Sequence, residues 1–140
     1  MKLLRNVLLT VVAALLVVAC ATGAGKNLRV EAQKETDVQY MPDELAGMLS
    51  ELGYRSVPIP DPDMGHDVRV SMQHGDYVMQ FEHLRNGRVR IDARMRIRDN
   101  FTQLHFYEIG SNGLTDSGLA LYDALRRRAE LEFGRENVSD

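Results

Sequence analysis

Charged and apolar residues alternate strictly from residue 88 to residue 98, and this stretch carries the side chains with the clearest binding chemistry. The charged positions are Arg88, Arg90, Asp92, Arg94, Arg96 and Arg98. A guanidinium group binds carboxylates and phosphates through paired hydrogen bonds, so several of them on one surface can recognise an anionic partner. With two residues further along the chain, they predict a binding site made of Arg90, Arg94, Arg96, His105 and Tyr107.

The same arginines are also compatible with a solvated surface that binds nothing. Acidic residues on the same face can neutralise it, and we expect this from Asp76, Glu82, Asp92 and Glu108. Alternating exposed charges also protect a sheet from aggregation at its edges. The two interpretations remain open, and the sequence slightly favours the solvated surface.

Residue types that serve catalysis or metal binding lack the spacing that such sites need. The histidines are His66, His74, His83 and His105, and no two have the spacing of paired metal ligands. Alternation places His83 on the inner, apolar face near Val89, and His105 on the outer, charged face beside Arg94, which would repel a cation. The serines lack the glycine-flanked turn of a nucleophile elbow. We predict no catalytic residues, no metal and no cofactor.

Acidic residues cluster in one loop, from residue 60 to residue 65. Its alternating Asp61 and Asp63, followed by Gly65, are similar to part of a calcium-binding loop. The remaining ligand positions and the terminal glutamate of such a loop are missing. We therefore interpret this segment as a linker.

The first twenty residues have the order of a secretory signal. Lys2 and Arg5 precede an apolar run over residues 7–18, and Ala19 and Cys20 follow. An apolar run of this length is too short to span a bilayer comfortably. The sequence Val17-Val18-Ala19-Cys20 resembles the lipobox of bacterial lipoproteins. This resemblance implies that residues 1–19 are cleaved and that Cys20 carries acyl chains.

The lipobox resemblance also implies a location in the cell envelope. Two or more acyl chains anchor a protein durably. Ala21 stands where an aspartate would resemble the inner-membrane retention signal of enteric bacteria, so we expect the outer membrane and a domain that faces the periplasm. Residues 20–27 then form the lipidated cysteine and a flexible tether. Cys20 is the sole cysteine, so the mature domain has no disulfide.

Net charge limits the choice of partners. The formal charge of −3 includes Lys2 and Arg5, so removal of residues 1–19 leaves −5, which argues against nucleic acid. We expect two partners, the membrane through the lipid anchor and an envelope protein or anionic envelope component. The leading hypothesis is a non-enzymatic accessory or interaction module. The alternative is a binder of an anionic small molecule, glycan or lipid head group on the arginine face, which a concave pocket would favour.

A meander of strands must position the arginine face. Val68, Val70 and Met72 indicate one strand, which ends at a two-residue turn, His74-Gly75. The following strand runs from Asp76 to Leu84. A three-residue loop over residues 85–87, with a left-handed Gly87, then leads into the arginine strand.

The loop length determines which residues face each other. The three-residue loop places Phe81 opposite Ile91, which keeps the apolar residues on one face. It also places Met79 opposite Ala93, Glu82 opposite Arg90 and Asp76 opposite Arg96. A two-residue turn at Asp99-Asn100 leads into a strand over residues 101–109, with Met95 opposite Leu104 and Ala93 opposite Phe106.

Helices and edge strands complete the predicted domain. Pro42 is suited to begin a helix that ends at Gly53, and Thr115 or Asp116 can cap a final helix that ends near Phe133. Residues 28–32 are a weak strand, and the prolines at 58 and 60 restrict residues 54–59 to an edge.

We predict an α+β fold, a mainly antiparallel meander sheet with two helices packed on one face. Residues 28–134 form the single domain and residues 135–140 a frayed tail. The helix, Leu52-Gly53-Tyr54 and the strand Asp67-Val68-Arg69-Val70 follow one another in an order that is loosely similar to uncharacterised small envelope lipoproteins. That resemblance implies no catalytic residues.

Overall fold

The computed structural model describes residues 25–31 and 37–140. The predicted signal sequence, Cys20 and residues 21–24 of the predicted tether lie outside the described residues. Within the described ranges, no helix is long and apolar enough to cross a membrane.

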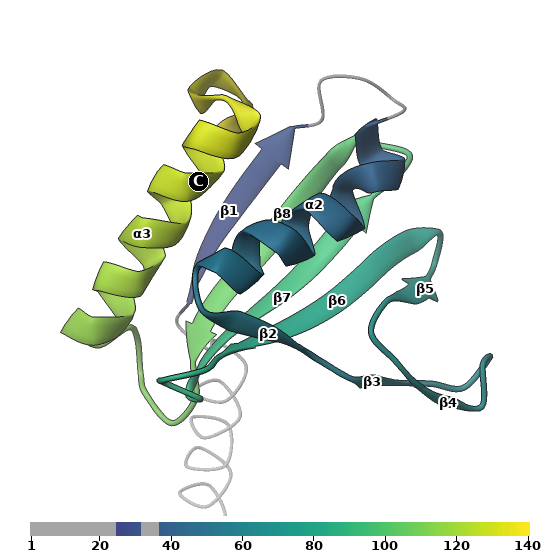
Figure 1. The fold of residues 1–140 in the computed structure, drawn as a ribbon, viewed down its shortest axis with the longest axis horizontal. Coiled ribbons are helices and arrows are strands. Elements are labelled where there is room, and N and C mark those ends of the chain that lie inside the picture. Colours follow the sequence, from purple (N-terminus) through teal and green to yellow (C-terminus); the bar gives the residue numbers. More distant parts are fainter. Residues whose placement is uncertain (1–24, 32–36) are drawn as a thin grey trace, which may run out of the picture.

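An antiparallel sheet of seven strands forms the centre of the fold (Figure 1). Six strands follow one another in the order β2-β6-β7-β8-β1-β9, and β5 also pairs with β6. The bounds are β1 (Lys26–Glu31), β2 (Tyr54–Val57), β5 (Ser71–Gln73), β6 (Asp76–His83), β7 (Val89–Arg96), β8 (Phe101–Glu108) and β9 (Val138–Ser139). A separate hairpin consists of β3 (Ile59–Asp61) and β4 (His66–Val68). The meander is therefore β6-β7-β8, and β1 joins it from the start of the chain.

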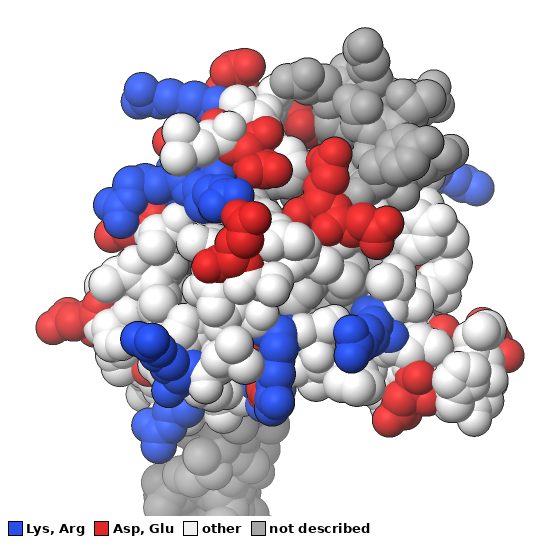
Figure 2. All heavy atoms as spheres, in the orientation of Figure 1, with Lys and Arg blue, Asp and Glu red and all other residues white. Residues whose placement is uncertain are grey.

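Two helices, α2 (Asp37–Glu51) and α3 (Asp116–Phe133), cover the inner face of the sheet. Inward residues alternate with outward ones along β6, β7 and β8, because successive side chains of a strand point to opposite faces. The inward residues share one core with both helices, which includes Leu45, Leu49, Phe81, Ile91, Phe106 and Leu125. The surface of this side carries charges of both signs (Figure 2). The predicted α+β class, with an antiparallel sheet and two helices, is confirmed.

The predicted register between β6 and β7 is confirmed. Phe81 lies opposite Ile91, and Glu82 lies opposite Arg90. The connection differs in detail, because Gly87 does not have a positive φ. Asn86 shapes the turn instead: its backbone N–H donates to His83 Nδ1 at 3.1 Å, and its carbonyl accepts from the Val89 N–H at 3.0 Å.

The predicted register between β7 and β8 is wrong by two residues. Ala93 lies opposite Leu104 and Met95 lies opposite Thr102. The cause is the turn, which takes four residues, 97–100, in place of two. Asn100 adopts a left-handed conformation with φ 59°, and its N–H donates to the Arg96 carbonyl at 2.8 Å. A shift of two residues keeps every side chain on its predicted face but changes its neighbours.

The segment after β2 differs from the prediction. Residues 68–72 are not one strand, because β4 pairs with β3 and β5 pairs with β6. Val70 and Met72 are exposed, and Ser71 is buried where its hydroxyl donates to Asp61 at 3.0 Å. The Asp61 carboxylate also accepts from the backbone of Asp63 at 3.0 Å. The predicted linker is therefore a hairpin turn that an aspartate stabilises.

Three boundaries also differ from the prediction. Strand β1 begins at Lys26, so the last two residues of the predicted tether, 26 and 27, belong to the sheet. Helix α2 begins at Asp37, so Pro42 lies inside it. Pro42 is the sixth residue of the helix, beyond the first four whose N–H groups have no partner within it, so it removes one backbone hydrogen bond near the start of α2. Residues 135–140 are not frayed: after a short 3₁₀ turn, η1 (Arg135–Asn137), β9 pairs with β1 and Val138 is buried. The buried Val138 side chain therefore holds the C-terminal end of the chain against the edge of the sheet.

Glu108 was expected on the outer face and lies instead on the inner face, where it is 8% exposed. Its carboxylate accepts from the backbone N–H of Thr115 at 3.2 Å and from the Thr115 hydroxyl at 2.9 Å. Thr115 caps α3, as predicted, and accepts from the Gly118 N–H at 3.1 Å. A carboxylate beside a helix N-terminus is favourable because that end is partially positive. Glu108 thereby fixes the start of α3 to β8.

Gly118→Ala is expected to lower the free energy of unfolding by about 1 to 2 kcal/mol, because overpacking outweighs the better helix propensity of alanine. A Cβ at this position would overlap the Glu108 carboxylate. Gly47→Ala is the matched control: nothing lies within 4 Å of a Cβ there, and α2 should gain about 0.5 to 1 kcal/mol. Urea unfolding of both variants checks this, and a Gly118→Ala protein as stable as wild type would contradict the contact.

Candidate functional site

A groove of about 630 Å³ lies on the outer face of the sheet. Its polar lining comes from β1, β5, β6, β7 and β8 and consists of Asn27, Gln73, Gln80, Asp92, Arg94, Gln103 and His105. Ile59 and Pro60 of β3, with Val78 of β6, supply an apolar wall. Strand alternation places the central residues, because even positions of β7 and odd positions of β8 point outward.

Of the five residues predicted to bind a ligand, the structure places two in the lining of the groove and three outside it. Arg94 and His105 line the groove. Arg90, Arg96 and Tyr107 lie on the same face but outside the lining. The predicted site and the observed groove therefore overlap in part, because the sequence could assign a face but not the hollow within it.

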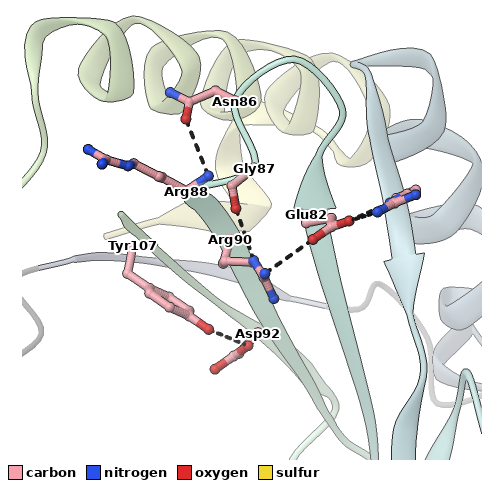
Figure 3. A network of polar contacts seen from close by, with 8 residues as sticks. Glu82, Asn86, Gly87, Arg88, Arg90, Asp92 and Tyr107 are labelled. Carbon is pink, nitrogen blue, oxygen red and sulfur yellow. Dashed lines mark hydrogen bonds and ion pairs between the residues drawn. The ribbon is translucent and has the colours of Figure 1, made fainter. Parts of the chain in front are cut away.

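Carboxylates pair with the arginines of the outer face. Arg94 Nη1 and Arg96 Nε lie 3.2 and 3.3 Å from Asp76 Oδ2. Arg90 Nη2 lies 3.2 Å from Glu82 Oε2, and Arg90 Nε donates to the Gly87 carbonyl (Figure 3). These pairs neutralise much of the positive charge, as the solvated-surface interpretation expects for Asp76 and Glu82.

Asp92 lies at the centre of the outer face, where the Tyr107 hydroxyl donates to its Oδ1 at 3.3 Å (Figure 3). Burial raises the pKa of the Asp92 carboxyl, and the Tyr107 hydrogen bond, His105 and Arg90 oppose part of that shift. Burial and the Asp92 charge raise the pKa of the Tyr107 hydroxyl. Tyr107 therefore remains a neutral donor at neutral pH. Within the described chain no arginine or lysine forms an ion pair with Asp92.

His105 was expected beside Arg94, and the two-residue change of register places it opposite Asp92. Its Nδ1 lies 2.9 Å from Asn27 Oδ1, so this nitrogen donates when the amide oxygen faces it. Its ring stacks on Tyr107, with 5.3 Å between centroids and an interplanar angle of 21°. The imidazole is thus held in one orientation at the side of the groove.

Sequence reasoning missed the amide side chains of the groove. Gln80 and Gln103 could have been found, because they occupy outward positions in strands that alternation identifies. Asn27 could not, because it reaches the groove through the long-range pairing of β1 with β8. Gln73 depends likewise on the short β5 strand. Each amide offers both donors and an acceptor.

His83 has a structural role, as its predicted inner position suggests. Its ring packs edge-on against Tyr54, at 5.0 Å between centroids, and accepts from Asn86. Burial lowers its pKa, and Arg85 lowers it further, so the neutral ring is favoured. Over residues 25–31 and 37–140, no group of three or more His, Cys, Asp or Glu residues could hold a metal ion.

Comparison of the chain with protein-family models, with curated proteins and with solved structures finds no match.

Proposed function

We propose that this chain is a membrane-tethered, non-enzymatic binding protein of the cell envelope, whose outer sheet face holds a glycan in the groove. The lipobox resemblance at Val17–Cys20 supports the lipid anchor and a periplasm-facing position at the outer membrane. The groove of about 630 Å³ carries the binding role. Its volume falls within the range of about 300 to 1,000 Å³ that is typical of ligand sites.

The lining favours a neutral ligand rich in hydroxyl groups over a polyanion. Gln73, Gln80 and Gln103 form no side-chain hydrogen bond with another described residue, so their amides are available to a ligand. Hydroxyl groups both donate and accept, which matches amide groups that do the same. Asp76 already pairs with Arg94, which reduces the attraction of the groove for an anion.

The groove also favours binding over hydrolysis. Glycoside hydrolysis by the usual mechanisms needs two carboxyl groups on either side of the scissile bond. Asp92 is the single carboxylate among the described residues that line the groove. The same lining contains no serine, threonine or cysteine that could act as a nucleophile.

The test is co-sedimentation of the full-length lipidated protein, in detergent, with isolated peptidoglycan, whose glycan strands are rich in hydroxyl groups and whose peptide stems carry the carboxylates. Gln80→Ala and Gln103→Ala should each weaken binding about fivefold, because a lost hydrogen bond costs about 1 kcal/mol. Arg96→Gln is the matched control for Arg94→Gln. Both arginines pair with Asp76, but Arg94 alone of the two lines the groove.

The outcomes distinguish ligand binding in the groove from ligand binding across the whole arginine face. Loss of binding in the glutamine and Arg94 variants, with Arg96→Gln unchanged, supports glycan binding in the groove. Equal, salt-sensitive losses in both arginine variants would instead support the anionic-ligand alternative. A wild-type protein that does not sediment with peptidoglycan would contradict the proposed ligand.

A further inference from the structure

The chain that follows the predicted lipid anchor enters the sheet at one end, where β1 begins and β8 finishes. Gly25 precedes β1, and a Cβ there would overlap the Phe106 carbonyl and lie 3.0 Å from Tyr107 Cβ. Gly25 therefore lies against the last residues of β8. Because an extended residue spans at most about 3.6 Å, residues 21–26 reach no further than roughly 20 Å. An acylated Cys20 would hold this end of the sheet close to the bilayer.

The same end exposes two large apolar side chains. Leu84 follows β6 and is 62% exposed, and Ile109 follows β8 and is 46% exposed. The Ile109 N–H donates to the Arg88 carbonyl at 2.8 Å, which joins the end of β8 to the loop of residues 84–88. Both residues continue the outward positions of their strands. They are two exposed apolar side chains at the rim of the outer face, one on each side of Arg88.

Basic residues accompany these two apolar side chains. Arg85 and Arg88 are exposed, and no carboxylate of the described chain lies within ion-pair distance of either. Figure 3 shows the Arg88 side chain pointing away from the ion pair of Arg90 with Glu82. Figure 2 shows several basic side chains in the lower part of this view, with acidic ones at its left edge and over the β3–β4 hairpin. Glu108, the nearest acid on β8, turns inward to α3.

We propose that Leu84, Arg85, Arg88 and Ile109 form a docking surface for a bilayer that contains anionic lipids. Leu84 and Ile109 enter the head-group region, and the two guanidinium groups contact lipid phosphates. This proposal rests on the lipid anchor of the proposed function. The anchor makes docking an intramolecular event, so a small contact that could not recruit a free protein is sufficient to orient a tethered one.

The chain contains no tryptophan, so a single introduced tryptophan reports its own environment. Leu84→Trp and Ile109→Trp place the probe on the docking surface. Leu131→Trp is the matched control, because Leu131 is 83% exposed and lies near the far end of α3. Each full-length lipidated variant is reconstituted into phosphatidylglycerol-containing vesicles, with and without brominated lipids.

Docking predicts blue-shifted emission and strong quenching by brominated lipid for Leu84→Trp and Ile109→Trp, and neither effect for Leu131→Trp. Adding Arg85→Glu and Arg88→Glu to the Leu84→Trp variant should reduce the quenching, and unchanged quenching would overturn the role of the arginines. If the three tryptophans show the same emission and quenching while the protein remains bound to the vesicles, the docking proposal is overturned. The proposed lipid anchor is not contradicted by that result. A protein that does not float with the vesicles would overturn both.

Discussion

Phe81→Ala is expected to lower the free energy of unfolding by about 3 to 5 kcal/mol, a large part of the total for a domain of this size. Phe81 is 2% exposed, belongs to the core and faces Ile91 across the β6–β7 pair. Truncation to alanine removes a buried ring and leaves a cavity between the sheet and the helices. Urea unfolding followed by circular dichroism measures the change.

Leu84→Ala is the control for this loss, because it truncates an exposed residue just after the same strand. We expect a change of less than about 0.5 kcal/mol. Equal effects of the two substitutions would mean that Phe81 does not face the core.

Cys20→Ser is expected to release the protein from the membrane fraction without unfolding the domain. Serine cannot carry the thioether-linked acyl chains, and the docking surface alone is too small to hold an untethered protein. Among the described residues the core begins at Leu28, so we expect the domain to fold without the anchor. Cell fractionation after a salt wash, with circular dichroism of the released protein, measures both properties.

Ala21→Ser is the matched control, because it changes the neighbouring residue and keeps the cysteine. It should remain in the membrane fraction. Recovery of the Cys20→Ser protein in the salt-washed lipid fraction would contradict the lipobox interpretation.

Alternation together with the length of the loop was enough to predict the β6–β7 register. Any shift by one residue would have brought Phe81 opposite a charged residue of β7. The same pattern could not separate the predicted register of β7 with β8 from the observed one, since they differ by two residues and leave every face unchanged. The left-handed conformation of Asn100 fixes the observed register. The alternation of charged and apolar residues does not reveal that conformation.

The site was less accessible from the sequence than the fold. Outward alternation correctly placed Arg94 and His105 on one face, yet it could not reveal a groove whose walls come from β1, β3 and β5. Those walls depend on pairings between distant segments and on a hairpin with little apolar pattern. Glu108 is a different case: the alternation of β8 already indicated its inner position, and its charge led to the wrong assignment.

Strand β1 lies between β8 and β9, so the first strand of the described residues pairs with the last two. A chain exported N-terminus first would cross the membrane before β1 could find either partner. Contacts between such distant segments form slowly, because a long loop must close before they are gained. If the chain is exported as proposed, its sheet is completed only after synthesis and translocation have ended. An exported chain would then lack a complete sheet while it passes through the translocation channel.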